Sequence, residues 1–138
     1  MLELIEKETL RLPIIVVVDD DVSIRLAIRR LIKSLGYEGI AFSSADEFLR
    51  SPYFKEADCL ILDIQMPGRS GLDLQSVMAA LGAPTPIIFI TAFHDEAARN
   101  QALGQGALGF LEKPFDSRIL ISLLQKALTP PKTPFPES

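Results

Sequence analysis

Five side chains suited to phosphate chemistry stand at or just after the ends of short apolar runs: Asp19, Asp20, Asp63, Thr91 and Lys113. Three carboxylates that lie close together repel one another, and a hard divalent cation such as Mg²⁺ relieves that repulsion. A carboxylate can also attack phosphorus, while a hydroxyl and an ammonium group can hold the phosphoryl oxygens. The set therefore indicates phosphoryl transfer onto a carboxylate, provided that the fold brings the five residues together.

Each of these residues, taken alone, has an ordinary structural explanation. An Asp pair after a strand is often a helix cap beside a solvated acid, and Asp63 is also consistent with a strand-ending acid that faces water. A Thr in this position is commonly a turn residue, and a single Lys is commonly a surface charge. The stronger signal is that the residues follow successive apolar runs in order.

Apolar runs alternate with segments of helical periodicity along the chain. Strands are expected at 14–18, 38–42, 59–62, 87–90 and 107–111, and helices at about 22–35, 45–51, 72–81, 95–104 and 117–128. Such alternation predicts an α/β fold in which helices cover both faces of a parallel sheet, with right-handed crossovers. The carboxyl ends of all strands then lie along one edge of the sheet, which would gather the five residues.

Capping residues mark the predicted helix boundaries. Asp21, Ser70 and Asp116 are placed to cap the helices that follow them, and Ser44–Glu47 has the pattern of a capping box. Pro52 is expected to end the helix that this box begins.

The composition is typical of a single globular domain. The chain has 138 residues, of which 48% are hydrophobic and 23% charged, and a net charge of −4 does not favour direct binding to nucleic acid. With one Cys and one His, a Cys/His metal cluster is excluded, and Cys59 is expected to be an inert buried thiol. The sequence contains neither a run long enough to span a bilayer nor a signal-peptide pattern, so we expect a cytoplasmic protein without membrane contact.

Three segments are expected along the chain. Residues 1–13 form an N-terminal tail, in which Leu2, Ile5, Thr9 and Leu12 have the spacing of a weak amphipathic helix, with the remainder of an upstream segment as the alternative. Residues 14–128 form the folded domain, and residues 129–138 are a proline-rich tail or linker.

Four ordered motifs resemble the receiver domain of response regulators: IIVVVDDD (14–21), LDIQMPG (62–68), IFITA (88–92) and FLEKPF (110–115). The resemblance runs from about Ile14 to Leu128, and PIIFITA and FLEKPFD look most like the FixJ-type subgroup. It implies the flavodoxin-like, or CheY-like, fold, with a five-stranded parallel sheet of order 2-1-3-4-5 and helices on both faces.

The resemblance implies a role for each acid of the set. Asp63 looks like the phosphoacceptor, which a sensor histidine kinase would phosphorylate. Asp20, Asp63 and the main-chain carbonyl of Gln65 look like ligands of Mg²⁺ (or Mn²⁺), and Asp19 would support the ion through water.

The same resemblance implies roles for the residues that would sense and hold the phosphoryl group. Thr91 and Lys113 resemble the switch hydroxyl and the phosphate-binding amine. Phe110 occupies the position of the aromatic switch residue, and Lys113–Pro114 matches a peptide bond that is cis in the family.

Gln65 and Phe93 lie two residues beyond Asp63 and Thr91, where family members tune hydrolysis of the acyl phosphate. We predict that Phe93 shields that bond, and a solvent-facing Phe without a role is the alternative. The output surface implied by the resemblance is the face formed by residues 95–128, which is expected to dimerise or to contact an effector domain.

The function implied is a phosphorylation-dependent switch of a two-component system, used for transcriptional control and not a multiple-turnover enzyme. One alternative is a haloacid-dehalogenase-type phosphatase, because Val18–Ser23 loosely fits its Asp-x-Asp-x-Thr start, but Asp63 would then have no role. Another is a pseudo-receiver that binds partners without being phosphorylated, and the complete set of acids, hydroxyl and amine argues against it. Whether an effector domain follows Leu128 stays open.

Overall fold

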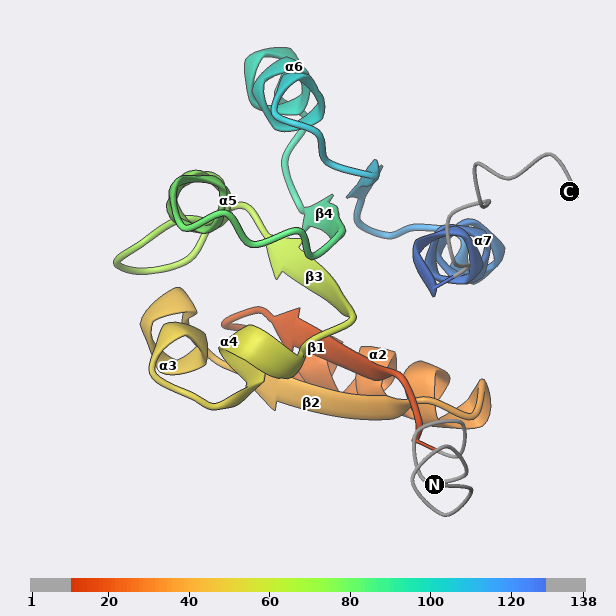
Figure 1. Cartoon of the computed structure of the whole chain (residues 1–138). Coiled ribbons are helices and arrows are strands. Elements are labelled where there is room, and N and C mark those ends of the chain that lie inside the picture. Colours follow the sequence, from red (N-terminus) through yellow and green to blue (C-terminus); the bar gives the residue numbers. More distant parts are fainter. Residues whose placement is uncertain (1–10, 129–138) are drawn as a thin grey trace, which may run out of the picture.

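The computed structural model describes residues 11–128 and contains one five-stranded parallel sheet (Figure 1). Its strands are β1 (Ile14–Val18), β2 (Glu38–Phe42), β3 (Cys59–Asp63), β4 (Ile87–Thr91) and β5 (Gly109–Glu112). They lie in the order β2-β1-β3-β4-β5, with every neighbouring pair parallel. The predicted fold and strand order are therefore confirmed. Residues 1–10 of the expected N-terminal tail (1–13) and all of the expected tail at 129–138 lie outside the described residues.

Within residues 11–128, five helices lie in the connections between strands and a sixth, α7, follows β5. Their bounds are α2 (Val22–Ser34), α3 (Ala45–Leu49), α4 (Tyr53–Glu56), α5 (Gly71–Ala80), α6 (Glu96–Gly104) and α7 (Ser117–Leu128). Alternate strand residues face opposite sides of the sheet, so each strand contributes to two separate apolar clusters. In one cluster, Val16, Leu60 and Phe89 pack with residues of α3, α5 and α6. In the other, Val17 and Ile61 pack with residues of α2 and α7. This two-sided burial explains why the strands read as continuous apolar runs.

Three predicted capping residues lie at the starts of the helices that follow β1, β3 and β5. Asp21 is the N-cap of α2 and accepts the Ser23 N–H at 2.8 Å. Ser70 begins α5 with a reciprocal capping box, in which the carboxylate of Asp73 accepts the Ser70 N–H at 3.1 Å. Asp116 accepts a backbone N–H at 2.8 Å in the first turn of α7. These three predictions are confirmed.

The predicted start of α3 is confirmed, whereas its predicted end is wrong. Ser44 accepts the Glu47 N–H at 3.1 Å as expected, and the Glu47 carboxylate also accepts the N–H and hydroxyl of Ser43, at 2.9 and 2.6 Å. Pro52 does not end α3, which already ends at Leu49. Instead Pro52 precedes the single turn α4, because its fixed φ of −67° suits the start of a helix.

Smaller differences occur at the ends of other elements. β5 begins at Gly109 rather than Ala107, because the Ala107 N–H still bonds to the carbonyl of Ala102 at 3.0 Å and so belongs to the end of α6. α5 covers Gly71–Ala80, one residue earlier at each end than expected.

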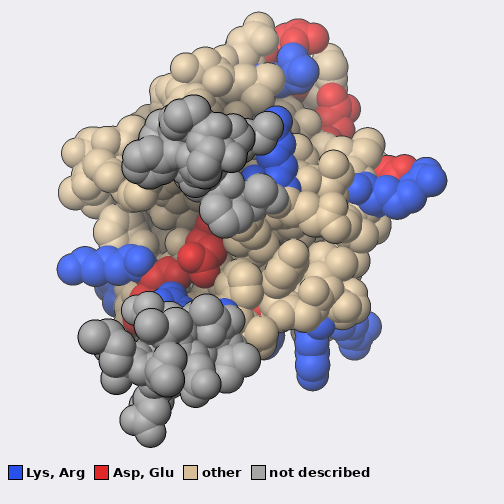
Figure 2. All heavy atoms as spheres, turned by 45° about the vertical axis from the view of Figure 1, so that its right-hand side comes forward, with Lys and Arg blue, Asp and Glu red and all other residues tan. Residues whose placement is uncertain are grey.

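Charged side chains are dispersed over the face shown in Figure 2, where Lys and Arg do not gather into one broad patch. Within residues 11–128, no helix has both the length and the apolar character needed to cross a membrane.

Candidate functional site

Three carboxylates meet at the carboxyl edge of the two central strands. β1 and β3 pair in register, with Val18 opposite Leu62, so the residues that follow, Asp19 and Asp63, are neighbours. Asp19 is fully buried and Asp63 is 5% exposed, whereas Asp20 is exposed. One oxygen from each of the three acids lies within 4.8 Å of the others. The predicted acidic cluster therefore exists, formed by residues from two strands that are remote in the sequence.

Lys113 reaches the same cluster from the end of β5. Its Nζ lies 2.8 Å from Asp19 Oδ2 and 3.6 Å from Asp63 Oδ2. Its backbone N–H donates to the carbonyl of Thr91 at 2.7 Å, which fixes the start of the loop beside β4. The Lys113–Pro114 peptide bond is cis. One ammonium thus faces two nearly buried carboxylates.

The electrostatics of the cluster perturb its ionisable groups. Burial, reinforced by the negative charge of Asp19, raises the pKa of Asp63 to about 6, although Lys113 opposes this shift. Burial works against the charge of Lys113, but its hydrogen bond to Asp19 and the two negative charges prevail, so the pKa of Lys113 is raised. Burial removes the water that would stabilise the charged form of Asp63, and Asp19 places a second negative charge beside it.

The donor set fits a hard divalent cation. Asp20 and Asp63 offer carboxylate oxygens, which Mg²⁺ and Mn²⁺ prefer, and the negative charge at the edge exceeds what Lys113 supplies. The pKa of Asp63 is raised mainly by burial, and the negative charge of Asp19 adds to this shift. This acidic edge thus has both the ligand chemistry and the electrostatic need for a metal ion.

The loop after β3 holds Asp63 in place through Gly71. The Gly71 N–H donates to the carbonyl of Ile64 at 2.9 Å, and a Cβ on Gly71 would collide with the carbonyl of Asp63 itself. The Gln65 N–H donates to Asp63 Oδ1 at 3.3 Å. The missing side chain of Gly71 thus lets α5 begin directly against Asp63.

A surface cleft opens over the acids and is lined by Asp20, Asp21, Asp63, Gln65, Ala92, Phe93 and Lys113. Phe93 is 56% exposed at its rim. Thr91 ends β4 as predicted but is 2% exposed and does not line the cleft; its Oγ1 accepts the Phe93 N–H at 3.2 Å. Phe110 lies in β5, and the centroid of its ring is 6.3 Å from the centroid of the Phe89 ring. Of the predicted site residues, the cleft is therefore lined by Asp20, Asp63, Gln65, Phe93 and Lys113. Asp19 and Thr91 lie beneath the surface.

Sequence reasoning missed two groups that position the acids. Arg25 Nη1 donates to the carbonyl of Asp19 at 2.8 Å, and the Asp21 N–H donates to Asp19 Oδ1 at 2.9 Å. A signal for Arg25 existed, because side chains in the first turns of a helix point back toward its N-terminus and Asp19 lies just before α2. His94 Nδ1 also lies 2.7 Å from Glu112 Oε2, linking the loop after β4 to the end of β5.

A model of the family described as "Response regulator receiver domain" matches residues 15–125. Nodulation protein W of Bradyrhizobium diazoefficiens is 42% identical over 114 residues, which cover 83% of this chain and 50% of that protein. Transcriptional regulatory protein FixJ of the same organism is 33% identical over 114 residues, which cover 83% of this chain and 56% of that protein. The chain thus spans about half the length of these curated relatives.

Solved structures agree with the sequence comparison. The crystal structure of a response regulator receiver protein from Burkholderia phymatum is 42% identical, with a TM-score of 0.73, and the match covers 87% of this chain and 99% of that one. The match supersedes the phosphatase alternative, under which Asp63 had no role. On the family match, the shared strand order and the acidic edge, this chain belongs to the response regulator receiver domain family, and it has FixJ among its relatives.

Proposed function

We propose that this domain, residues 14–128, is a phosphorylation-dependent signalling switch whose phosphoacceptor is Asp63. The observation that supports this most directly is a nearly buried carboxylate with an ammonium group 3.6 Å away, at the floor of an open cleft. The donor would be a phosphohistidine of a sensor histidine kinase, the partner that the receiver family implies. The domain accepts one phosphoryl group and later loses it, so it is not a multiple-turnover enzyme.

In the proposed reaction, a carboxylate oxygen of Asp63 attacks phosphorus and forms the P–O bond of an acyl phosphate, while the P–N bond to the donor imidazole breaks. The bonding electron pair returns to that imidazole nitrogen. The imidazole leaves as a neutral ring when its other nitrogen carries a proton. Lys113 is placed to bind a phosphoryl oxygen, since its Nζ already lies within reach of Asp63. The Gln65 N–H fixes the orientation of the Asp63 carboxylate.

We further propose that Asp20, Asp63 and the main-chain carbonyl of Gln65 bind Mg²⁺ or Mn²⁺, with Asp19 acting through water. A bound divalent cation would neutralise charge on the phosphoryl oxygens. Asp19 already has two partners of its own, the Lys113 ammonium and the Asp21 N–H, which suits a supporting rather than a direct role.

The output would use Thr91 and Phe110 as the switch pair and the face of residues 95–128 as the contact surface. In support, Thr91 lies on β4 between the strands that carry Asp63 and Phe110, so a shift of its hydroxyl toward a phosphoryl group would leave space in front of β5. The output itself, a dimer contact or an effector domain for transcriptional control, is proposed from the family and from relatives such as FixJ.

Phe93 is proposed to shield the acyl phosphate from water, because it stands at the cleft rim beside Asp63 and is partly exposed. A Phe93→Glu variant should lose its phosphoryl group faster than the parent, and Phe93→Leu should lose it at nearly the parent rate. Equal rates for all three proteins would leave Phe93 as a surface residue without this role.

The test of the proposed function is intact-mass spectrometry after incubation with acetyl phosphate and Mg²⁺. We expect one added phosphoryl group per chain in the parent and none in Asp63→Asn, with Glu56→Gln labelled like the parent. Turnover of many equivalents without a retained adduct would indicate a phosphatase. No adduct in a folded parent would indicate a phosphorylation-blind interaction module, and either result would overturn the proposal.

A further inference from the structure

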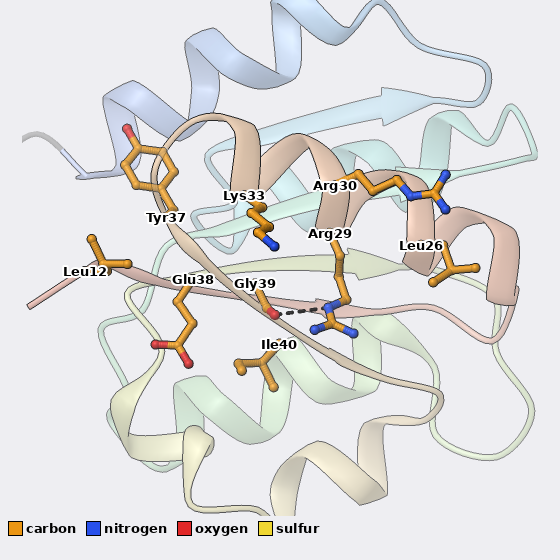
Figure 3. A pocket seen from close by; sticks show the side chains of 9 residues that line it. All are labelled: Leu12, Leu26, Arg29, Arg30, Lys33, Tyr37, Glu38, Gly39 and Ile40. Atoms are coloured by element: carbon orange, nitrogen blue, oxygen red, sulfur yellow. Dashed lines mark hydrogen bonds between the residues drawn. The ribbon is translucent and has the colours of Figure 1, made fainter.

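A groove of about 480 Å³ runs along the free edge of the sheet, between α2 and β2 (Figure 3). It shares no lining residue with the acidic cleft. Its lining comes from both elements, from the turn between them and from the segment before β1: Leu12, Leu26, Arg29, Arg30, Lys33, Tyr37, Glu38, Gly39 and Ile40. Figure 3 shows Leu12 at one end of the groove and Leu26 at the other, with the side chains of Arg29 and Lys33 between them. β2 is an edge strand, so this side of the sheet has no neighbouring strand among the described residues.

The groove is basic and partly apolar. Three cations line it, Arg29, Arg30 and Lys33, against the single carboxylate of Glu38. Among residues 11–128, none of the three cations lies in an ion pair, and Arg29 instead donates its Nε–H to the carbonyl of Gly39 at 3.1 Å. At its two ends, Leu12 is 52% and Leu26 is 47% exposed. Its surface is therefore suited to an acidic segment that also carries apolar side chains.

The chain itself contains such a segment directly beside the groove. Residues 2–10 read LELIEKETL, with three Glu, one Lys and four Leu or Ile residues. They join the groove through Leu12, which lines it. Nine residues reach about 30 Å when extended or about 14 Å as a helix, and either length is enough to follow a groove of this kind. The covalent link keeps the segment at an effective concentration on the order of millimolar, so weak contacts suffice for binding.

We propose that residues 2–10 occupy this groove in the same molecule. Their Glu side chains pair with Arg29, Arg30 and Lys33, and their Leu and Ile side chains cover the apolar surface of Leu26, Tyr37 and Ile40. The occupied groove shields the edge of β2, which would otherwise offer unpaired backbone groups to a second chain. This proposal is independent of phosphorylation at the acidic cleft.

The test uses the full chain with a spin label near the middle of the segment. Cys59 is fully buried, so a label added to a Lys7→Cys variant attaches at the introduced residue. We expect the label to weaken the amide NMR signals of Lys33, Gly39 and Ile40 by at least about twofold, since millimolar effective concentration and a millimolar Kd give about half occupancy.

Two further samples decide between occupants. In the labelled chain that also carries Arg30→Glu and Lys33→Glu, the broadening at Gly39 and Ile40 should disappear, whereas a Lys55→Glu control should keep it. A mixture of labelled, isotope-free chain with unlabelled, isotope-enriched chain should show no broadening. Absence of broadening in the first sample, its persistence after the double charge reversal, or its appearance in the mixture, which would indicate a second copy, would each overturn the proposal.

Discussion

Replacing Asp63 by Asn should stabilise the metal-free protein at neutral pH, although it removes the proposed phosphoacceptor. Asp63 lies beside Asp19 with a 7% exposed side chain, and these surroundings raise its pKa from 3.8 to about 6. Because this pKa is higher in the folded than in the unfolded chain, the folded protein binds the extra proton between about pH 4 and pH 6. The free energy of unfolding therefore falls as the pH rises through that window, and it stays lower above it.

The expected size follows from the shift. A change of about two pKa units corresponds to about 3 kcal/mol at about 1.36 kcal/mol per unit, and solvent screening in the open cleft reduces this to about 2 kcal/mol. The amide in the Asp63→Asn variant cannot ionise, so the variant does not lose free energy of unfolding as the pH rises. The amide also keeps an oxygen that can accept the Gln65 N–H. The stability difference between variant and parent should grow from nearly zero at about pH 4 to about 2 kcal/mol above about pH 7.

Urea unfolding in EDTA at several pH values measures this difference. Glu56→Gln removes one exposed acid on α4 and should change the free energy of unfolding by less than about 0.5 kcal/mol at any pH. At the proposed metal site, Mg²⁺ would bind the folded parent in preference to the variant, so excess Mg²⁺ should narrow the stability gap. Two results would refute the reasoning. One is equal stability of the Asp63→Asn variant and the parent at about pH 7.5 in EDTA, and the other is a stability difference at about pH 4 as large as that at about pH 7.5.

Three further predictions concern positions around the site and between the helices. Gly71→Ala should lower the free energy of unfolding by about 2 kcal/mol in urea melts, because its Cβ meets a backbone carbonyl that cannot move aside, whereas Gly104→Ala, which meets nothing, should be neutral or slightly stabilising. Gln75→Met should be stabilising by about 1 kcal/mol: the amide gives one hydrogen bond of 3.0 Å to a carbonyl of α6, but its buried oxygen has no partner among the described residues. NMR titration should find the pKa of His94 above its usual value, because of its hydrogen bond to Glu112 and the charge of that carboxylate, and Glu112→Gln should lower it; an unchanged pKa would contradict the pairing.

The convergence of the acidic cluster and Lys113 was predictable because it depends on a topological rule rather than on local detail. Residues at the carboxyl ends of parallel strands must share an edge, whatever the loops between them do. Asp19, Asp63 and Lys113 therefore met as expected, although 94 positions separate the first from the last.

Details that depend on side-chain packing or on competition between neighbouring partners were not predictable in this way. The Glu47 carboxylate bonds to Ser43, and Pro52 precedes the one-turn helix α4 instead of ending α3, because both alternatives satisfy the same local rules. The burial of the Thr91 hydroxyl and the close approach of Gly71 to Asp63 depend on how loops fold over the sheet, which strand and helix periodicity does not encode.

Mapping the phosphorylated residue tests the central claim most directly. Borohydride reduces an aspartyl phosphate to homoserine, so peptide sequencing by mass spectrometry after phosphorylation, reduction and digestion identifies the modified position. The account predicts homoserine at position 63 and Asp at positions 19 and 20. Homoserine at either of those two positions, or at none of the three in a protein that had gained a phosphoryl group, would contradict it.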